Sequence, residues 1–377
     1  MSDKHREPGP AYSTISIVGL GLIGGSLALA LRRSGFPGRI LGVSRPETCA
    51  EASRLGAVDE SFGYEEIVEA ASRSDLVVLA SPIGVILEHL KALGASGAKL
   101  APGLVVTDVG STKREINRMA RESLPPRALF IGGHPLAGSE QRGLGAADPF
   151  LFQNAYYVLT PLPDVPLDAV ARLASLLGAT GARVVVLSAE DHDRVAATIS
   201  HLPQLLAVSL VRFLDDLGDN REHGLHLAAG GFRDMTRIAS SPFSVWRDIL
   251  ATNKDVVSRV LDRFLDRTRR ALEDLEPGAL EKEFGSAAAT RGEIPRDTKG
   301  FLHRLWDVLV VVEDRPGMIA EIAAPLAARG INIKDIEVLK VREGEAGTLR
   351  LAFSSQDEAR AAIAELGSAG IEARLRE

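Results

Sequence analysis

The feature that most constrains the fold is a glycine-rich turn near the start of the chain. Residues 15–19 are rich in β-branched side chains, and helix-forming residues follow the turn. The segment 18–24 between them reads V-G-L-G-L-I-G, the spacing of a dinucleotide-binding turn. Gly19 is expected to allow the tight turn, Gly21 the approach of a pyrophosphate, and Gly24 the packing of the helix on the sheet. This order of strand, turn and helix predicts a nucleotide-binding βαβ unit.

The glycine turn and the end of the second predicted strand supply the expected cofactor contacts. These contacts are Gly19, Leu20, Gly21, Leu22, Ile23, Gly24, Ser44 and Arg45. The free N–H groups and positive dipole end of the helix favour phosphates. An NAD site usually has Asp or Glu about twenty residues after the glycines, where this chain has Ser44 and Arg45. Without that carboxylate the pair favours NADP. NAD binding through backbone groups, with Arg45 in solvent, is the open alternative.

Short apolar runs alternate with amphipathic helical stretches from residue 13 to residue 163. The predicted strands are 15–19, 39–43, 76–80, 104–108, 129–132 and 156–160. The predicted helices between them are 24–33, 46–55, 64–72, 85–93 and 113–122. This alternation is typical of parallel strands joined by helical crossovers. We therefore predict an α/β fold with a doubly wound, Rossmann-type dinucleotide-binding domain at 13–163.

Two further domains are predicted after the first. Residues 164–284 are mostly helical apart from a strand at 183–187, and their apolar periodicity predicts helices that pack together and against a subunit partner. Residues 285–304 show no periodicity and are predicted to be a linker. The order strand, helix, strand, strand, helix, strand at 305–377 predicts a ferredoxin-like domain.

Composition restricts partners and compartment. The net charge of −6 gives no electrostatic reason to expect nucleic acid or an anionic membrane as a partner. Glycines interrupt the apolar segment that begins at Ile15, so no signal peptide or membrane anchor is predicted.

Cys49 is the single cysteine, which excludes an intramolecular disulfide and indicates a reducing cytoplasm. His223 and His226 have no paired carboxylate motif, so no metal site is predicted. We expect a cytoplasmic homodimer.

Two polar motifs follow predicted strands of the first domain. Ser111 and Lys113 come shortly after the strand that ends at Asp108, and His134 follows the strand that ends at Gly132. Ligands of open α/β sheets bind outside the carboxyl ends of the strands. We therefore expect Ser111 and His134 on neighbouring loops beside the cofactor.

Four spaced motifs resemble those of one known family. They are Gly110-Ser111-Thr112-Lys113, His134-Pro135-Leu136-Ala137-Gly138, Ser200-His201-Leu202-Pro203 and Trp246-Arg247-Asp248-Ile249. In this order after the glycine turn, they resemble the prephenate and arogenate dehydrogenases of tyrosine biosynthesis, from about residue 13 to residue 285. Residues from Asp307 onward resemble an ACT domain, an amino-acid-sensing module.

The resemblance implies an oxidative decarboxylation of prephenate to 4-hydroxyphenylpyruvate with NAD(P)+. Hydride leaves the ring carbon that bears the hydroxyl, and loss of carbon dioxide makes the ring aromatic. The enzyme must then supply position and a proton acceptor. His134 is predicted to accept the hydroxyl proton, and Ser111 to orient the imidazole and contact the substrate. A turn-capping role is the alternative for His134.

The two carboxylates of prephenate require cations or strong donors. Arg247 is predicted to bind one of them in a bidentate manner, and His201 is the second candidate. Lys113 is predicted to contact the substrate or the cofactor. The alternatives are a packed core histidine at position 201 and a surface lysine at position 113.

The C-terminal domain is predicted to confer inhibition by tyrosine. The turn at 314–317 and the residues around Asn332 offer donors for the charged ends of an α-amino acid. Asp314, Gly317 and Asn332 are therefore the predicted effector contacts. A domain that only strengthens the oligomer is the alternative.

Three other functions compete with prephenate oxidation. Arogenate carries an ammonium group, which favours a nearby acidic residue, and none stands in the matched motifs. A 3-hydroxy-acid dehydrogenase would normally use a lysine base in the helical domain, whereas His134 lies in the first domain. A nucleotide-binding sensor with a ligand-responsive ACT domain would not need His134, Ser111 and Arg247 together.

Overall fold

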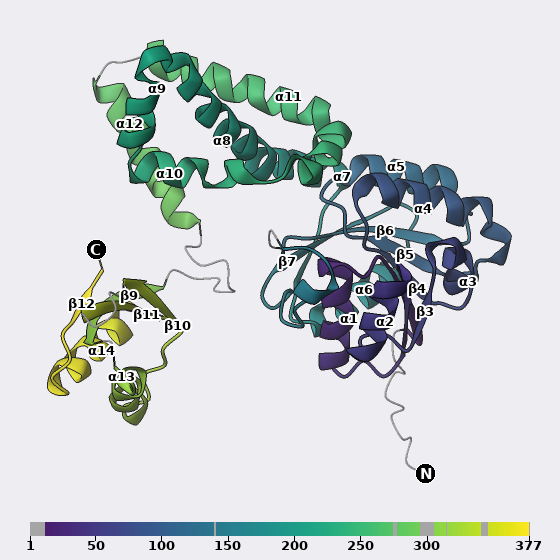
Figure 1. Cartoon of the computed structure of the whole chain (residues 1–377), viewed down its shortest axis with the longest axis horizontal. Helices are drawn as coiled ribbons and strands as arrows, with labels where there is room; N and C mark the ends of the chain where they lie inside the picture. Colours follow the sequence, from purple (N-terminus) through teal and green to yellow (C-terminus); the bar gives the residue numbers. More distant parts are fainter. Residues whose placement is uncertain are drawn as a thin grey trace. The chain divides into compact units, whose positions relative to one another are not determined.

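The computed structural model describes residues 12–138, 141–273, 277–294, 305–313, 315–340 and 346–376. The chain divides into two compact units, residues 1–274 and 275–377 (Figure 1). The first unit holds the predicted dinucleotide-binding fold and most of the helical region, and the second holds the predicted ferredoxin-like fold.

The first unit is built on an eight-stranded sheet. In spatial order its strands are β3 (Glu60–Phe62), β2 (Arg39–Val43), β1 (Thr14–Val18), β4 (Leu76–Leu79), β5 (Val105–Asp108), β6 (Leu129–Pro135), β7 (Tyr156–Pro161) and β8 (Arg183–Val186). Neighbouring strands are parallel except β6 and β7, which pair antiparallel. The predicted Rossmann-type fold is confirmed. The short strand β3 and the reversal at β7 are additions to it.

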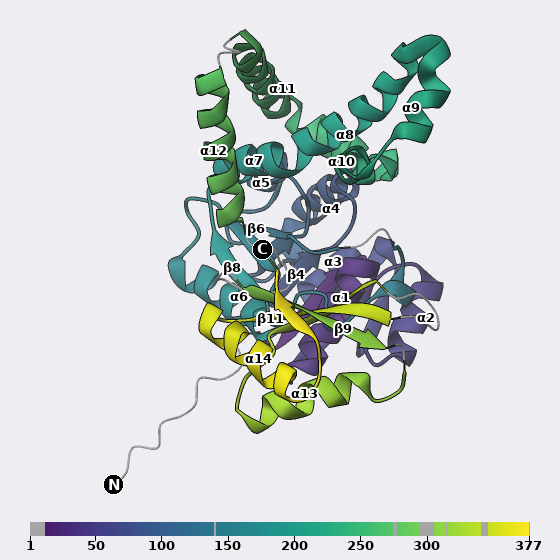
Figure 2. The ribbon, with the colours of Figure 1, turned by 90° about the vertical axis from the view of Figure 1, so that its left-hand side faces the viewer.

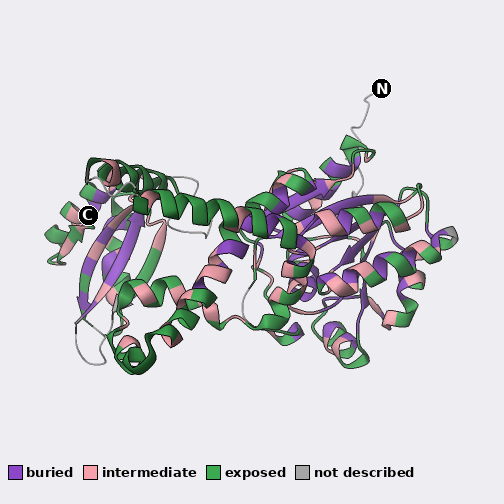
Figure 3. Ribbon diagram, turned by 90° about the horizontal axis from the view of Figure 1, so that it is seen from above, coloured by how far each residue is buried: buried purple, intermediate pink, exposed green. Residues whose placement is uncertain are grey.

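Helices cover both faces of this sheet (Figure 1). Helices α1 (Leu22–Arg33), α2 (Pro46–Arg54) and α6 (Leu167–Ala179) pack on one face, and α3 (Ile67–Ser72), α4 (Ile83–Ala95) and α5 (Arg114–Ser123) on the other. The central strands are buried between the two layers (Figure 3). All four residues of β4, L-V-V-L, are buried. A strand covered on both faces needs such a continuous apolar run.

Two predicted boundaries in this unit need correction. Strand β8 belongs to the main sheet, so the predicted start of the helical domain at residue 164 falls inside the crossover from β7 through α6 to β8. Strand β6 continues to Pro135 because β7 pairs with it, with His134 opposite Val158. His134 therefore lies in a strand and not on the predicted loop.

The rest of the first unit is helical, as predicted. Its elements are α7 (Ala189–Ala196), a π-helical turn (Ala197–His201), α8 (Leu202–Phe213), a 3₁₀ turn (Leu214–Asn220), α9 (Arg221–Leu227), α10 (Gly230–Thr236), a 3₁₀ turn (Arg237–Ser240) and α11 (Phe243–Glu273). The run Ala189–Leu227 is long and apolar enough to cross a membrane, by length and composition only. It also carries the buried polar residues His192, Asp193 and His201. Their hydrogen bonds to other protein groups favour a helix packed against protein.

The second unit begins with α12 (Pro277–Glu293), which corrects the linker prediction for residues 285–293. This segment contains three alanines in succession, and alanine is the strongest helix former. Residues 295–304 of the predicted linker lie outside the described residues.

The predicted ferredoxin-like domain is confirmed. Its elements are β9 (Trp306–Glu313), α13 (Met318–Ala328), β10 (Asp335–Lys340), β11 (Ala346–Phe353), α14 (Gln356–Ser368) and β12 (Ala373–Leu375). The antiparallel sheet has the order β10-β11-β9-β12. Helices α13 and α14 share one core with the sheet (Figure 2).

Candidate active site

The glycine turn has the geometry of a phosphate cradle. Gly19 has φ +96°, and a Cβ atom there would lie 2.5 Å from the Ala80 carbonyl oxygen. A Cβ atom on Gly24 would lie 1.9 Å from the Gly19 carbonyl oxygen. A Cβ atom on Gly21 would meet no heavy atom within 4 Å among the described residues. The turn is thus tight at two glycines and open at the third, as a bound pyrophosphate requires.

Helix α1 begins directly after this turn. Gly21 is its N-cap residue and provides no side-chain cap. The first N–H groups of α1 therefore remain available for an anion. The Leu20 side chain is buried in the core, so only its backbone can approach a cofactor, whereas Leu22 and Ile23 are partly exposed. These features fit the phosphates of a dinucleotide.

Ser44 and Arg45 lie at the same edge of the sheet as the glycine turn. Val18 pairs with Val43 in the parallel ladder of β1 and β2, so both strands end together. Ser44 is buried and its N–H donates to the Phe62 carbonyl at 3.1 Å. Arg45 is exposed and precedes α2.

His134 is held through one ring nitrogen. Its Nδ1 atom lies 2.8 Å from Nε2 of His192, which belongs to α7. The residue His134 is partly exposed. No hydrogen bond joins His134 to Ser111 among the described residues. His192 is thus the residue bonded to the His134 ring in this structure, and the orienting role of Ser111 stays a prediction.

His192 is in turn held by its neighbour in the sequence. Its Nδ1 atom lies 2.8 Å from Oδ1 of Asp193, and both side chains are buried. The Asp193 carboxylate also accepts the backbone N–H groups of Lys113 at 2.7 Å and Arg114 at 3.0 Å. This carboxylate ties α7 to the start of α5.

Lys113 differs from its prediction. Its side chain is fully buried, and its amine pairs with Asp108 and donates to the Gly133 carbonyl at 2.6 Å. Asp108 also accepts the N–H groups of Gly110 at 2.7 Å and Gly133 at 3.0 Å. A buried amine bonded to protein groups has no surface for a ligand. Lys113 is therefore a structural residue and not a substrate contact.

Ser111 stands on a loop that helices of the C-terminal half hold in place. Thr112 bonds to Thr252 of α11 through the hydroxyl groups at 2.7 Å. Arg114 pairs with Asp255 of α11 at 2.9 Å. Ser111 between these anchors is partly exposed and has no hydrogen bond among the described residues. Its hydroxyl is available to a ligand.

His201 is buried at the end of the π-helical turn, where it accepts a bond through Nδ1. The partner is Nδ2 of Asn253, at 3.3 Å. Asn253 has non-helical backbone angles inside α11, and the same amide donates to the Asp193 carbonyl at 3.0 Å. The His201 and Trp246 rings form a T-shaped pair, with ring centroids 6.0 Å apart. Since the amide donates to Nδ1, the ring proton of neutral His201 lies on Nε2.

Arg247 follows Trp246 on α11. Its Nε atom pairs with Asp248 at 3.1 Å, and its side chain is 67% exposed. Asp248 also accepts the N–H of Gly84, near the start of α4, at 3.0 Å. The terminal nitrogens of Arg247 have no hydrogen-bond partner in the described part of the chain, so the fork is free for a carboxylate.

The environment keeps both site histidines neutral. Burial holds the pKa of His134 well below its ordinary range, and the nearby His192, Lys113 and His201 act in the same direction. Burial lowers the pKa of His201 to about 4, against the opposing effect of Asp193. Both rings are therefore neutral at neutral pH, the form in which an imidazole has one nitrogen that can accept a proton and one that can donate a hydrogen bond.

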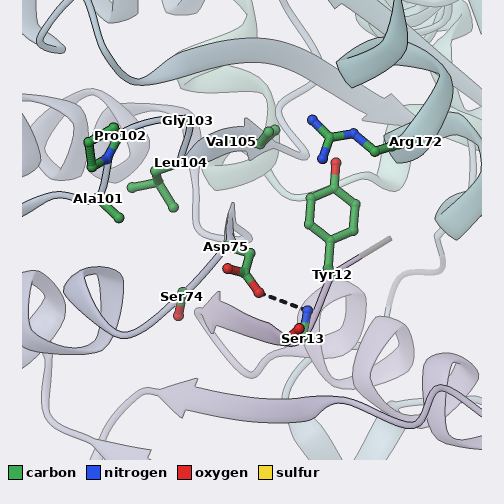
Figure 4. Close-up of a pocket in the computed structure, with 10 residues that line it drawn as sticks. All are labelled: Tyr12, Ser13, Ser74, Asp75, Ala101, Pro102, Gly103, Leu104, Val105 and Arg172. Carbon is green, nitrogen blue, oxygen red and sulfur yellow. Dashed lines mark hydrogen bonds between the residues drawn. The ribbon is translucent and has the colours of Figure 1, made fainter. Parts of the chain in front are cut away.

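A separate cavity of about 210 Å³ lies at the opposite edge of the sheet (Figure 4). It is lined by residues that precede β1, β4 and β5, among them Tyr12, Asp75 and Leu104. The Asp75 carboxylate there accepts the Ser13 N–H at 2.7 Å. This cavity lies at the amino ends of the strands, away from His134.

The second unit has a cavity of about 340 Å³ beside the turn between β9 and α13. Gly317, with φ +95°, lines it together with Arg315, Met318 and Val338. The predicted effector contact Asp314 lies outside the described residues. Asn332 is exposed and is not among the described residues that line the cavity.

Comparison with known proteins identifies the family. The prephenate dehydrogenase nucleotide-binding domain matches residues 27–186, and the dimerization domain of the same enzyme matches 188–284. An ACT domain matches 306–365. Prephenate dehydrogenase of Bacillus subtilis (strain 168) is 40% identical over 352 residues, which are 92% of this chain and 93% of that protein. The chain belongs to the prephenate dehydrogenase family.

Two solved structures of prephenate and arogenate dehydrogenases are similar to this chain. Aquifex aeolicus prephenate dehydrogenase, in complex with hydroxyphenyl propionate and NAD+, is 31% identical with a TM-score of 0.64, over 75% of this chain and 98% of that chain. Synechocystis arogenate dehydrogenase is 31% identical with a TM-score of 0.66, over 74% of this chain and 98% of that chain. Family membership makes this chain an oxidoreductase with a nicotinamide dinucleotide cofactor, and the dimerization domain supports a homodimer.

Four polar residues of this site were missed in the sequence. They are Asp108, His192, Asp193 and Asn253, all buried. The available signals were an aspartate at the end of a predicted strand and a His-Asp pair just before a long apolar helical run. Neither signal indicates a partner, because His192 lies 58 residues from His134 in the sequence.

Two glycine variants separate the structural and binding roles of the turn. Gly24→Ala should lower the free energy of unfolding of the cofactor-free protein by about 1–3 kcal/mol, since the new methyl group meets a backbone oxygen. Gly21→Ala should keep that stability and weaken NAD(P) binding at least about tenfold, because the methyl group fills the open space. Chemical denaturation and a binding titration measure the two effects. If both variants lost stability and NAD(P) affinity to the same extent, the separate roles assigned to Gly24 and Gly21 would be wrong.

Asp108→Asn should destabilise the protein strongly. The variant leaves the Lys113 amine buried beside a neutral partner, which typically costs about 3–5 kcal/mol. Asp108→Asn combined with Lys113→Met should recover part of this loss, because no buried charge then remains. Urea unfolding of the single and double variants is the measurement. If the double variant were less stable than Asp108→Asn alone, the unpaired charge of Lys113 would not be the main cause of the lost stability.

Proposed function

We propose that the chain oxidises and decarboxylates prephenate to 4-hydroxyphenylpyruvate with NAD(P)+. The observation that carries the proposal is the His134 imidazole at the carboxyl end of the sheet. One of its nitrogens is bonded to His192, and the other has no partner among the described residues. The phosphate cradle at Gly21 lies at the same edge of the sheet. The 40% identity to the Bacillus subtilis prephenate dehydrogenase supports the choice of substrate.

His134 is the general base in this proposal. Its free Nε2 atom accepts the proton of the ring hydroxyl oxygen while hydride leaves the carbon that bears this hydroxyl. When bound, the nicotinamide ring accepts that hydride. Ser111 contributes an unpaired hydroxyl that donates to the substrate oxygen and keeps the hydroxyl directed at the imidazole.

Arg247 and His201 recognise the negative charges of the substrate. The free terminal nitrogens of Arg247 form a fork that suits one carboxylate. His201 donates from Nε2 as a neutral imidazole, because Asn253 donates to its Nδ1 atom. Trp246, which precedes Arg247 on α11 and contacts the His201 ring, adds an aromatic surface.

Ser44 and Arg45 favour NADP over NAD. The end of β2 carries no carboxylate to repel a 2′-phosphate, and the exposed Arg45 is a donor for one. The related Aquifex aeolicus enzyme was solved with NAD+, so both cofactors belong in the assay. We further propose that the enzyme works as a homodimer in the cytoplasm, supported by the matched dimerization domain and the single cysteine.

Arogenate is the second candidate substrate. The similarity to Synechocystis arogenate dehydrogenase favours it. Arogenate differs from prephenate by an ammonium group in place of the keto group, which calls for an acidic partner. Rates with both substrates and both cofactors distinguish the possibilities. Oxidation of arogenate alone would contradict the proposed substrate.

His134→Asn tests the base. The variant should bind cofactor and prephenate and lose turnover by roughly 10² to 10⁴, the usual contribution of a positioned base. In the wild type, the acidic limb of the pH profile of kcat/KM should lie below pH 6.5, because a base of lowered pKa is protonated only at lower pH. A limb centred above pH 7, or near-normal turnover in the variant, would remove His134 from this role.

Ser44→Asp tests the cofactor preference. The new carboxylate should bind the ribose hydroxyls and repel a 2′-phosphate, which moves the ratio of kcat/KM for NADP over NAD down by about tenfold or more. Ser53→Asp, an exposed position on α2, is the matched control for added charge. A wild-type enzyme that already rejects NADP would contradict the assignment of Ser44 and Arg45.

We also propose that tyrosine inhibits the enzyme through the cavity in the ACT domain. Regulation of this kind requires tyrosine to bind the less active state more tightly, typically by about 1–3 kcal/mol. The apolar lining from Met318, Val338 and Leu349 suits an aromatic side chain. Arg315 lies on the same wall, where its guanidinium pairs with Glu313 and Glu321.

Val338→Glu tests this regulation in the full-length protein. Val338 is 58% exposed on the cavity wall, so the change should preserve folding and weaken tyrosine inhibition at least about tenfold by placing a charge beside the effector. Arg360→Glu, on the exposed side of α14, is the control. Equal inhibition of wild type and Val338→Glu would indicate that tyrosine competes at the active site instead.

A further inference from the structure

A chain of two hydrogen bonds connects the proposed base to a buried carboxylate. Nδ1 of His134 meets Nε2 of His192 at 2.8 Å, and Nδ1 of His192 meets Oδ1 of Asp193 at 2.8 Å. His192 is 3% exposed and Asp193 is fully buried, so water does not compete for these bonds. His134 alone of the three is partly exposed.

The direction of these bonds follows from the partners of Asp193. Its Oδ1 and Oδ2 atoms accept the backbone N–H groups of Lys113 and Arg114, and a carboxylate has no proton to donate. His192 must therefore donate from Nδ1. Neutral His192 then has a bare Nε2 atom, which accepts a proton from Nδ1 of His134. The other ring nitrogen of His134, Nε2, then carries no proton and has a free lone pair.

The opposite set of tautomers is unfavourable in this arrangement. A proton on Nε2 of His192 would place the Nδ1 lone pair 2.8 Å from a carboxylate oxygen. It would also compel Nδ1 of His134 to act as an acceptor. The proton of His134 would then occupy Nε2, the atom that must receive the substrate proton. That form of His134 cannot act as a base.

We propose that His192 and Asp193 are a positioning pair that fixes His134 as the Nδ1–H tautomer and so leaves Nε2 as the proton acceptor. This inference rests on the proposed function of His134 and adds the residues that make it possible. The proton taken from the substrate hydroxyl forms the Nε2–H bond of an imidazolium. Its positive charge faces the Asp193 carboxylate through the His192 ring.

Two other titratable groups near His134 disfavour a positive charge on its ring. The amine of Lys113 opposes a positive charge on His134, although Asp108 neutralises much of its field. His201, from the π-helical turn, has the same unfavourable effect when charged. Asp193 is the carboxylate connected to His134 by hydrogen bonds. It is held in place by the start of α5 and by Asn253, which donates to its carbonyl.

The test combines a tautomer measurement with kinetics. Nitrogen NMR of ¹⁵N-histidine-labelled protein, with His134→Asn for assignment, reports which ring nitrogen of His134 carries the proton. The kinetics compare wild type with His192→Phe, which removes the acceptor, and with His192→Gln, whose amide oxygen can accept from Nδ1. His89→Phe is the matched control, because His89 is buried on α4 against Tyr64 and lies outside the site.

The wild type should carry the His134 proton on Nδ1 near neutral pH. His192→Phe should lose roughly 10- to 100-fold in kcat with little change in KM, the usual effect of removing an outer-shell partner. Its acidic limb in kcat should move to lower pH, because neutral His192 accepts the Nδ1 proton of the imidazolium and so favours that charged form. His192 opposes the charge on His134 only when His192 is itself protonated. His192→Gln should recover much of kcat, and His89→Phe should keep the wild-type pH profile.

Two results would overturn the positioning pair. One is a wild-type His134 with its proton on Nε2, and the other is a His192→Phe enzyme with wild-type kcat and pH profile. If His192→Phe does not fold, the wild-type spectrum and His192→Gln still decide the question. If the enzyme oxidised neither prephenate nor arogenate, the proposed function would be wrong. The positioning pair would still be tested, because the NMR measurement needs no substrate.

Discussion

The buried ion pair between Lys113 and Asp108 is the interaction on which the arrangement of the site depends. It joins the end of β5 to the start of α5, and through the Gly133 carbonyl it also reaches β6 next to His134. Glycine at position 133 permits this approach, since a Cβ atom there would lie 2.4 Å from the Asp108 carbonyl oxygen. Both charges are fully buried, so each requires the other. The pair fixes the spacing between the loop of Ser111 and the strand of His134.

A second buried carboxylate, Asp193, holds the helical region in place beside the site. Asp193 binds the backbone at the start of α5, orients His192, and is itself held by Asn253 of α11. The first carboxylate therefore positions the site within the sheet, and the second connects that site to the helices that carry His201 and Arg247. Charges are tolerated in the interior here because every one is paired or hydrogen-bonded. The result is a preorganised His134, the proposed base, with one ring nitrogen free.

The sequence predicted the strands and helices of both α/β parts well, because alternating apolar runs and the glycine turn are local patterns. It predicted less where the structure depends on a contact between residues far apart in the sequence. Strand β3 has three residues and no distinct pattern, and β6 extends to His134 only because β7 pairs with it. Lysine is usually exposed, so the burial of Lys113 could not be read from its motif. The partnership of His134 with His192 crosses 58 residues and depends on the packing of α7 against the sheet.

The central claim is that His134 receives the substrate proton at Nε2 while His192 holds its other nitrogen. The most direct measurement is a crystal structure of the full-length protein with NADP+ and an unreactive prephenate analogue that keeps the ring hydroxyl. The claim predicts the hydroxyl oxygen about 2.6–3.2 Å from Nε2 of His134, with the bond from Nδ1 to His192 intact. A hydroxyl held by His201 or Ser111 alone, with Nε2 of His134 directed away from it, would contradict the claim.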